Sequence, residues 1–254
     1  LDPNLGIEGL PQSGTGQTTL FTGVNAAHSI GKHFGPYPYS TLRPIIEEKN
    51  IFRRLREAGK RVCFANAYPQ KFFDYFKDKQ TRLTVTTLSC SYNNMPLHQS
   101  DSLEKRKAIS ADITNAGWAK MGYPHIPLID AAEAGRRLVR LLDENDFVLF
   151  EYWRTDKAGH SENMSEAVAA LELFDGTLGG ILETLDTSDS LLLVTSDHGN
   201  IEDMTTKVHT RNPVPAILYG HRHEEFARAL LVQPDLANVT PAILQFIAET
   251  AAVK

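Results

Sequence analysis

Acidic and imidazole side chains gather in three short segments in the second half of this 254-residue sequence. Asp156 and His160 follow one predicted strand, Asp197 and His198 follow a second, and His209 stands just before a third. Because chemistry in open α/β sheets collects at the carboxyl ends of strands, we expect the three segments to meet at one rim. Carboxylate and imidazole are the ligands expected for zinc, manganese or iron. The cluster therefore predicts a divalent metal site.

Ser13 is the candidate nucleophile. It opens a Ser-Gly-Thr-Gly run at 13–16 before a predicted helix, where backbone N–H groups and the helix dipole favour an approaching anion. By itself such a run is most often a cap or a turn. A phosphate-binding P-loop is excluded because Gln17 stands where its lysine must be. A nucleophile elbow is excluded because Pro11 and Thr15 occupy the positions where it needs glycine.

The elements that must position these side chains alternate between helix and strand, which predicts an α/β fold with a mostly parallel central sheet flanked by helices. The strand over 146–152 is apolar enough to be covered on both faces, and the strand over 190–195 is predicted to be another buried strand. The alternation breaks over 68–127, which predicts a small inserted cap on a core formed by 1–67 and 128–254. Helices are predicted over 15–30, 42–58, 131–144, 161–185 and 241–248, and strands over 61–66, 146–152, 190–195 and 214–219.

Composition narrows the possible partners and compartment. The 26 Lys and Arg residues against 31 Asp and Glu give a net charge of −5, which speaks against nucleic-acid or anionic-membrane partners. No apolar run approaches the roughly 20 residues that a membrane span needs. Cys63 and Cys90 can neither build a disulfide framework nor supply a zinc spacing, which favours a reducing compartment, the cytoplasm.

The motifs resemble those of the alkaline phosphatase superfamily, in the branch of cofactor-independent phosphoglycerate mutase and phosphopentomutase. They occur in the family's order and span nearly the whole chain. The segment 234–244 also resembles the family's closing segment, with Asn238 where an aspartate is usual. The resemblance implies an alkaline-phosphatase-like fold. The matching pieces are the run at 13–16, Asp-Lys-Ala-Gly-His at 156–160, Ser-Asp-His-Gly-Asn at 196–200 and His-Thr-Arg-Asn-Pro-Val-Pro at 209–215.

The resemblance also implies a phosphotransfer site with two divalent metal ions, manganese or zinc. Two cations about 3.5–4 Å apart lower the pKa of a hydroxyl group and bind phosphoryl oxygens. Ser13 would attack phosphorus in line and form a phosphoserine. Arg154 and Arg211, beside the ligands, are candidate phosphate clamps. The implied ligands are Asp156, His160 and His209 for one metal, and Asp197 and His198 for the other.

Three features depart from the family pattern. The family also holds its second metal through an aspartate at the end of an N-terminal strand, and no such strand precedes Leu1. Since the sequence opens with Leu rather than Met, we expect it to lack its beginning. Gln17 stands where the mutases usually carry histidine, and the segment between Ser13 and Asp156 is much shorter than the domain that phosphoglycerate mutase inserts there.

These features favour a phosphomonoester hydrolase that acts on a small phosphorylated substrate. A phosphosugar mutase of the same superfamily is the close alternative, because it would need a cap that keeps water from the phosphoserine. A non-catalytic member that binds a metal and a phosphorylated ligand is the third possibility. A sulfatase is disfavoured because the Cys/Ser-x-Pro-x-Arg sequence is missing around Ser13.

Overall fold

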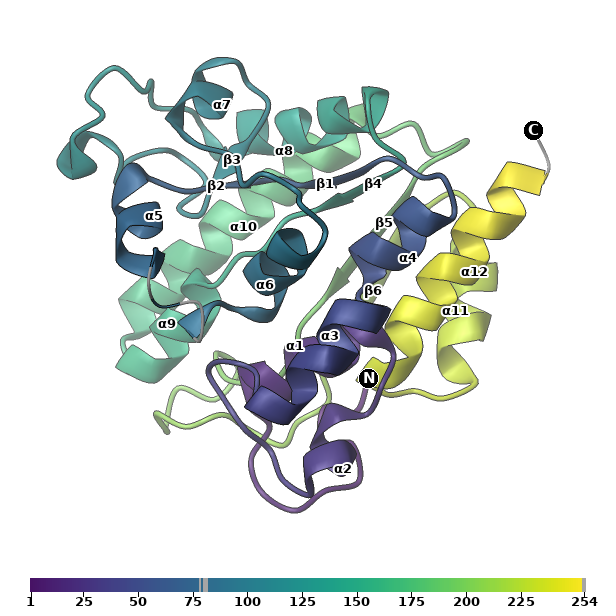
Figure 1. Ribbon diagram of the computed structural model, residues 1–254. Coiled ribbons are helices and arrows are strands. Elements are labelled where there is room, and N and C mark those ends of the chain that lie inside the picture. The colour runs from purple at the N-terminus through teal and green to yellow at the C-terminus, as the bar shows by residue number, and fades with distance from the viewer. Residues whose placement is uncertain (78, 80–81, 253–254) are drawn as a thin grey trace.

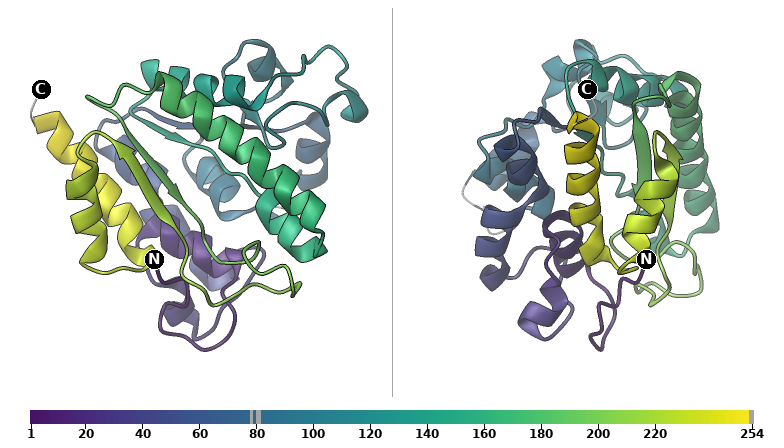
Figure 2. Two further views of the ribbon diagram at one scale, coloured as in Figure 1. Left: turned by 180° about the vertical axis from the view of Figure 1, so that it is seen from behind. Right: turned by 90° about the vertical axis from the view of Figure 1, so that its right-hand side faces the viewer.

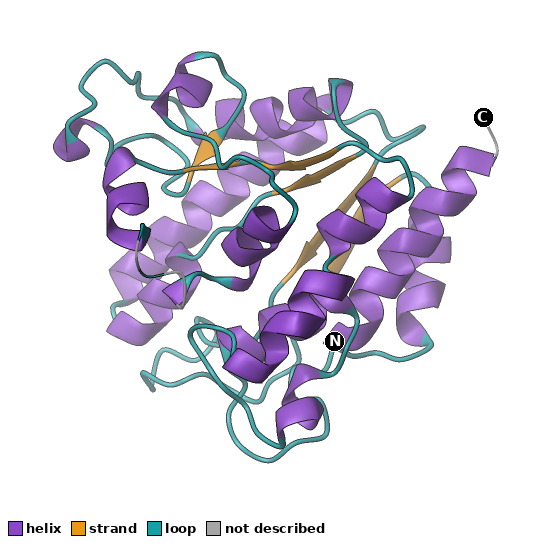
Figure 3. Ribbon diagram, viewed as in Figure 1, coloured by secondary structure: helices purple, strands orange, loops and turns teal. Residues whose placement is uncertain are grey.

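The computed structural model describes residues 1–77, 79 and 82–252. Residues 78, 80 and 81 of the predicted cap, and 253 and 254 of the predicted core, lie outside the described residues. Helices surround a few short strands, and the N-terminus lies near the start of the last helix (Figures 1 and 3). Among the described helices, none combines the length and the apolar character needed to cross a bilayer.

Within the described residues, six short strands form three pairs. The α/β class with parallel strands is confirmed. Instead of a single mostly parallel sheet, however, the described strands form two parallel pairs and one antiparallel pair. Ala65 links the two parallel pairs, because its N–H donates to Leu149 O and its carbonyl accepts from Ile109 N, both at 2.8 Å. The pairs are β1 (Val62–Phe64) with β4 (Phe147–Leu149), β2 (Asn66–Ala67) with β3 (Ile109–Ser110), and β5 (Leu191–Thr195) with β6 (Ala216–Gly220).

The helices are mostly shorter than the sequence predicts. The α-helices are α1 (Ser13–Thr22), α2 (Ala26–Ile30), α3 (Arg43–Lys49), α4 (Ile51–Glu57), α5 (Gln70–Phe76), α6 (Val85–Tyr92), α7 (Ser100–Glu104), α8 (Ala131–Arg140), α9 (Arg154–Ser161), α10 (Met164–Thr184), α11 (His223–Leu231) and α12 (Val239–Ala252). Short 3₁₀ turns are η1 (Ser40–Leu42), η3 (Ala119–Met121), η4 (Leu141–Asp143) and η5 (Leu236–Asn238).

Two predicted helices are each broken in the middle. The helix predicted over 15–30 is wrong at Gly23, which adopts φ 74° and ends α1. The helix predicted over 42–58 is wrong at Asn50, whose extended backbone separates α3 from α4. The buried Asn50 side chain serves both ends: its amide donates to Ile46 O at 2.7 Å, and its oxygen accepts from Arg53 N at 2.9 Å.

The main apolar core lies between α1, α3, α4, α6, α11 and α12, with Phe52 at its centre. α6 belongs to the predicted cap, and its Val85 and Leu88 are buried in this core. Trp118, also in 68–127, is buried in a separate small cluster with Leu103 and Ile126. The division into core and cap stays a prediction.

The β5–β6 pair has one covered face and one open face. Leu191, Leu193 and Leu218 pack against the main core. The other face, which we call the open face, consists of Leu192, Val194, Ile217 and Tyr219, since side chains alternate along a strand and these four are paired across the two strands. Ile217 is 53% exposed. Figure 2 shows α11 and α12 along one side of the pair and α10 beyond the other. All five residues of β5 are of intermediate burial, so the strand over 190–195, which was predicted to be buried, is only partly buried.

Candidate metal centre

Asp156 and His160 lie on helix α9, where the sequence predicted a loop. They are four residues apart and so share one face of the helix. His160 Nε2 lies 3.4 Å from Asp156 Oδ1. The predicted helix over 161–185 begins later, at α10, because the Asn163 side chain caps it by accepting from Ser165 N and Glu166 N.

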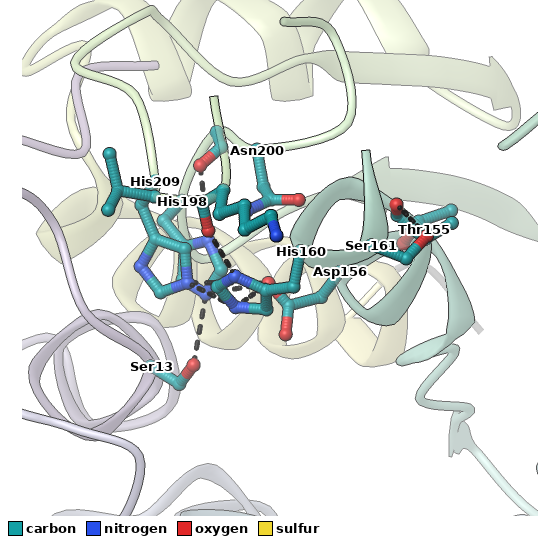
Figure 4. A network of polar contacts seen from close by, with 12 residues as sticks. Ser13, Thr155, Asp156, His160, Ser161, His198, Asn200 and His209 are labelled. Atoms are coloured by element: carbon teal, nitrogen blue, oxygen red, sulfur yellow. Dashed lines mark hydrogen bonds and ion pairs between the residues drawn. The ribbon is translucent and has the colours of Figure 1, made fainter. Parts of the chain in front are cut away.

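His209 completes a three-residue set with this pair (Figure 4). Its Nε2 lies 3.2 Å from His160 Nε2 and 3.3 Å from Asp156 Oδ1. One ligand atom from each of the three residues lies within 4.8 Å of the others. The set is therefore compact enough for all three side chains to bind one ion.

The outer nitrogens of both histidines are fixed by backbone carbonyl groups. His160 Nδ1 lies 2.5 Å from Lys207 O, and His209 Nδ1 lies 2.7 Å from Pro11 O. A carbonyl oxygen only accepts, so each Nδ1 carries the proton and each Nε2 of a neutral ring presents a lone pair. With both rings neutral, the buried Asp156 Oδ1 has no hydrogen-bond partner. Three acceptor atoms thus converge without a donor, an arrangement that fits a cation.

Electrostatics in this cluster favour a positive charge between the side chains. Burial by itself raises the pKa of Asp156, but the three neighbouring histidines hold it below its usual value. Burial by itself lowers the pKa of His209, but Asp156 and the Pro11 carbonyl raise it above its usual value. A proton on His209 Nε2 and a metal ion are therefore alternative occupants, and metal binding would release that proton.

Ser13, Asp197 and His198 form a second group beside the first. Ser13 Oγ lies 2.9 Å from His198 Nε2 (Figure 4), which in turn lies 3.6 Å from Asp197 Oδ2. The rings of His198 and His209 stack with centroids 3.7 Å apart. His198 Nε2 is also 4.0 Å from Asp156 Oδ1. The structure thus brings the predicted nucleophile and all five predicted ligands into one neighbourhood.

Gly16 allows helix α1 to reach this site. A Cβ atom at this position would lie 2.5 Å from Asp197 O, closer than real Cβ atoms approach a carbonyl oxygen. Only glycine therefore lets α1 pack against the segment that follows β5. This contact places Ser13, the first residue of α1, beside His198.

Arg154 and Arg211, the two arginines predicted to bind phosphate, have different neighbours. Arg211 Nε donates to Gly9 O at 2.9 Å, at the exposed edge of the site. Arg154 begins α9, and its charge acts on the phenol of Tyr152. Within the described part of the chain, neither has a hydrogen bond or ion pair with the five ligand residues, so their role stays a prediction.

Several groups beside these residues have no role that the sequence predicted. The carbonyls of Pro11 and Lys207 orient the histidines, but residue type does not reveal a carbonyl contact. Gln17, one turn after Ser13, has a buried side-chain oxygen without a partner. The Asn200 amide is likewise buried and unpartnered, and it fills the space above Gly159.

A family model matches the second half of the chain. This family model, described as Metalloenzyme superfamily, matches residues 120–250, which include the five ligand residues but not Ser13. Two similar proteins are both named 2,3-bisphosphoglycerate-independent phosphoglycerate mutase. The one from Thermomicrobium roseum is 40% identical over 109 residues, covering 40% of this chain and 21% of the relative. The one from Moorella thermoacetica is 31% identical over 131 residues, covering 49% and 25%.

The match covers only part of those relatives: the chain spans about a quarter of the length of the curated proteins it matches. Among solved structures, the PH0037 protein from Pyrococcus horikoshii is similar, with a TM-score of 0.42 and 17% identity over 65% of this chain and 39% of that one.

Proposed function

Since this chain belongs to the Metalloenzyme superfamily, we propose that it transfers a phosphoryl group through Ser13 at a centre of two divalent cations. Membership confirms the resemblance to the alkaline phosphatase superfamily and implies divalent metal binding. The observation that carries the proposal is the 2.9 Å contact between Ser13 Oγ and His198 Nε2, directly beside the converging Nε2 atoms of His160 and His209.

The donor set fits manganese or zinc. Asp156, His160 and His209 would hold one ion, and Asp197 and His198 the other. Divalent cations would lower the pKa of the Ser13 hydroxyl and neutralise the phosphoryl oxygens. The Lys207 and Pro11 carbonyls keep the Nε2 lone pairs directed at the site, which means that little reorganisation is needed when a cation binds.

In the proposed reaction, Ser13 Oγ attacks phosphorus as the bond to the leaving oxygen breaks. The serine proton is lost, the departing oxygen takes up a proton, and a phosphoserine results. A second hydroxyl group then attacks the phosphoserine and regenerates Ser13. Because phosphoryl transfer depends mainly on positioning and charge neutralisation, a preformed cluster of this kind suits it.

The acceptor of the phosphoryl group decides between a mutase and a hydrolase. The sequence favoured water as the acceptor, that is, a phosphomonoester hydrolase. The names of the relatives support the alternative instead, because they are phosphoglycerate mutases. We therefore propose a small phosphorylated substrate whose own second hydroxyl group is the acceptor, as in a phosphosugar or phosphoglycerate mutase.

The test combines metal analysis with trapping of the phosphoserine. The chain is loaded with Mn²⁺ or Zn²⁺, incubated with labelled 3-phosphoglycerate, a phosphopentose or an aryl phosphate, and quenched in acid. We expect two metal ions per chain, label on Ser13, and loss of turnover by about 10³-fold or more in Ser13→Ala. Ser161→Ala is the matched control, because this hydroxyl lies at the end of α9 and donates to Ala158 O at 2.8 Å.

The products separate the candidate functions. Transfer of label between two positions of the substrate in excess over free phosphate indicates a mutase, and release of free phosphate indicates a hydrolase. Bound metal without turnover on any phosphoester would point to a binding protein. Full turnover in Ser13→Ala would contradict the assigned nucleophile.

A further inference from the structure

The carboxylate of Glu202 joins the two segments that carry His198 and His209. One oxygen accepts from Asn200 N at 2.7 Å, on the segment that follows His198. The other oxygen accepts from the Thr210 hydroxyl and from Asn212 Nδ2, the latter at 3.1 Å. A single side chain thus holds three donors from two segments that are ten residues apart.

The backbone leaves a space for this carboxylate at Gly199. Thr210 N donates to Gly199 O at 3.0 Å, and the two residues form an isolated antiparallel bridge. A Cβ atom at Gly199 would lie 2.5 Å from Glu202 Oε1 and even closer to the Thr210 hydroxyl. Glycine at this position is therefore required by the carboxylate and the hydroxyl together.

The link acts directly on the neighbours of the ligands. Asn200 and Thr210 are buried, whereas the Glu202 residue as a whole is exposed and does not belong to the apolar core. Hydrogen bonds to a charged carboxylate are worth more than neutral ones. Besides the bridge at Gly199, Glu202 is therefore a second direct link between the segment that follows His198 and the segment that follows His209.

We propose that Glu202 is a positioning residue of the metal centre, which holds the stacked rings of His198 and His209 at the separation that metal binding requires. The inference rests on the proposed function. Glu202 is not among the three residues whose ligand atoms converge, and its two oxygens instead accept three hydrogen bonds from the chain. Its removal should therefore weaken metal binding and change the coordination of the metal while the fold remains.

Cobalt binding by the full chain tests this inference without an activity assay. Co²⁺ is titrated into wild type, Glu202→Ala, Glu202→Gln and His209→Ala, and its visible absorption is recorded. We expect Glu202→Ala to raise the apparent Kd for Co²⁺ about 10- to 100-fold, because the loss of a residue that orients metal ligands weakens binding by this much. The intensity of the visible Co²⁺ absorption band should fall toward that of His209→Ala. Glu202→Gln should have a smaller effect, because its amide oxygen still accepts while its NH₂ group cannot accept from Asn200 N.

Asp203→Ala is the matched control. Its carboxylate is the next one along the chain, but it accepts only from Thr205 within its own turn. Wild-type-like affinity and absorption in Glu202→Ala would overturn the inference and leave the proposed function standing. Failure of wild type itself to bind Co²⁺ would overturn the metal centre and, with it, this inference. Should circular dichroism show that Glu202→Ala is unfolded, Glu202→Gln decides, and binding equal to wild type there overturns the inference.

Discussion

Glu151, two residues after β4, carries a carboxyl group that is held away from water. Burial, together with the neighbouring Asp197 charge, raises its pKa to about 7, although the Thr86 hydroxyl, which donates to it at 2.7 Å, acts in the opposite direction. In the unfolded chain a glutamate titrates near pH 4.3. Below that pH both states are protonated, so the residue imposes no penalty on folding.

This pKa predicts a pH-dependent stability that Glu151→Gln removes. Between about pH 4.3 and 7 the unfolded chain loses the proton and the folded chain keeps it, so the free energy of unfolding falls as pH rises. Above about pH 7 the loss is complete, on the order of 3–4 kcal/mol. Urea unfolding at pH 5 and pH 8 should therefore show a smaller difference in Glu151→Gln than in wild type. Glu172→Gln, at an exposed residue of α10, is the control. An equal change in the free energy of unfolding between pH 5 and pH 8 in wild type and both variants would refute the prediction.

The metal cluster makes a second prediction at this scale. Metal binding requires neutral Nε2 atoms on His160 and His209, and Asp156 raises the pKa of His209. Because this pKa lies above the usual histidine value of about 6.5, protons begin to compete with the cation above that pH, and the apparent affinity should fall steeply as pH drops through this range. Isothermal titration with Mn²⁺ at pH 5.5 and 7.5, in buffers of different ionisation enthalpy, should also reveal proton release. The same affinity at both pH values would contradict the assigned ligands.

At the scale of elements, the packing of α8 on α10 supports the helix that carries Asp156 and His160. Gly135 and Gly180 lie where the two helices meet: a Cβ on Gly135 would be 2.8 Å from Ile181 N, and one on Gly180 would be 2.7 Å from Ala132 C. α10 in turn packs on α9, since Ala158 is buried with Ala167 and Ala170. A shift of α10 would thus be passed on to the metal ligands.

Opposite effects are expected from alanine at two adjacent glycines of α10. Gly180→Ala forces the two backbones apart and should lower the free energy of unfolding by about 1–3 kcal/mol. Gly179→Ala points into open space and should raise it by about 0.5–1 kcal/mol, because alanine is the better helix former. Urea denaturation of both variants checks the pair. A destabilised Gly179→Ala, or a neutral Gly180→Ala, would show that the helices do not meet as described.

At the scale of the whole molecule, local signals in the sequence predicted more than long-range ones. The acidic and imidazole residues could be chosen by type and spacing, and the structure brings Asp156 and His209 within 3.3 Å. The break at Asn50 could not be foreseen, because it depends on a buried side chain that caps two helices at once. The three strand pairs were equally hidden, since apolar runs such as 190–195 do not reveal which strand lies beside them. The link through Glu202 depends on two segments meeting in space, which residue spacing does not encode.

The molecule exposes a large total surface, and part of its apolar surface lies on the open face of the β5–β6 pair. The chain exposes 12,687 Å², whereas a folded monomer of 28.2 kDa typically exposes about 11,000 Å². Ile217 and Tyr219 on this face are 53% and 40% exposed, and Leu171 on α10 is 47% exposed. Apolar surface of this kind, next to strand edges, promotes association with other chains.

We therefore expect the isolated chain to self-associate through the open face. Sedimentation velocity at increasing protein concentration should show a rising weight-average mass for wild type, and Ile217→Lys should suppress that rise, because a lysine on this face would have to be buried on association. Val232→Lys, at a residue that is 85% exposed beyond α11, is the control and should associate like wild type. A wild type that stays monomeric at every concentration, or equal suppression by both lysine variants, would show that the open face does not drive association.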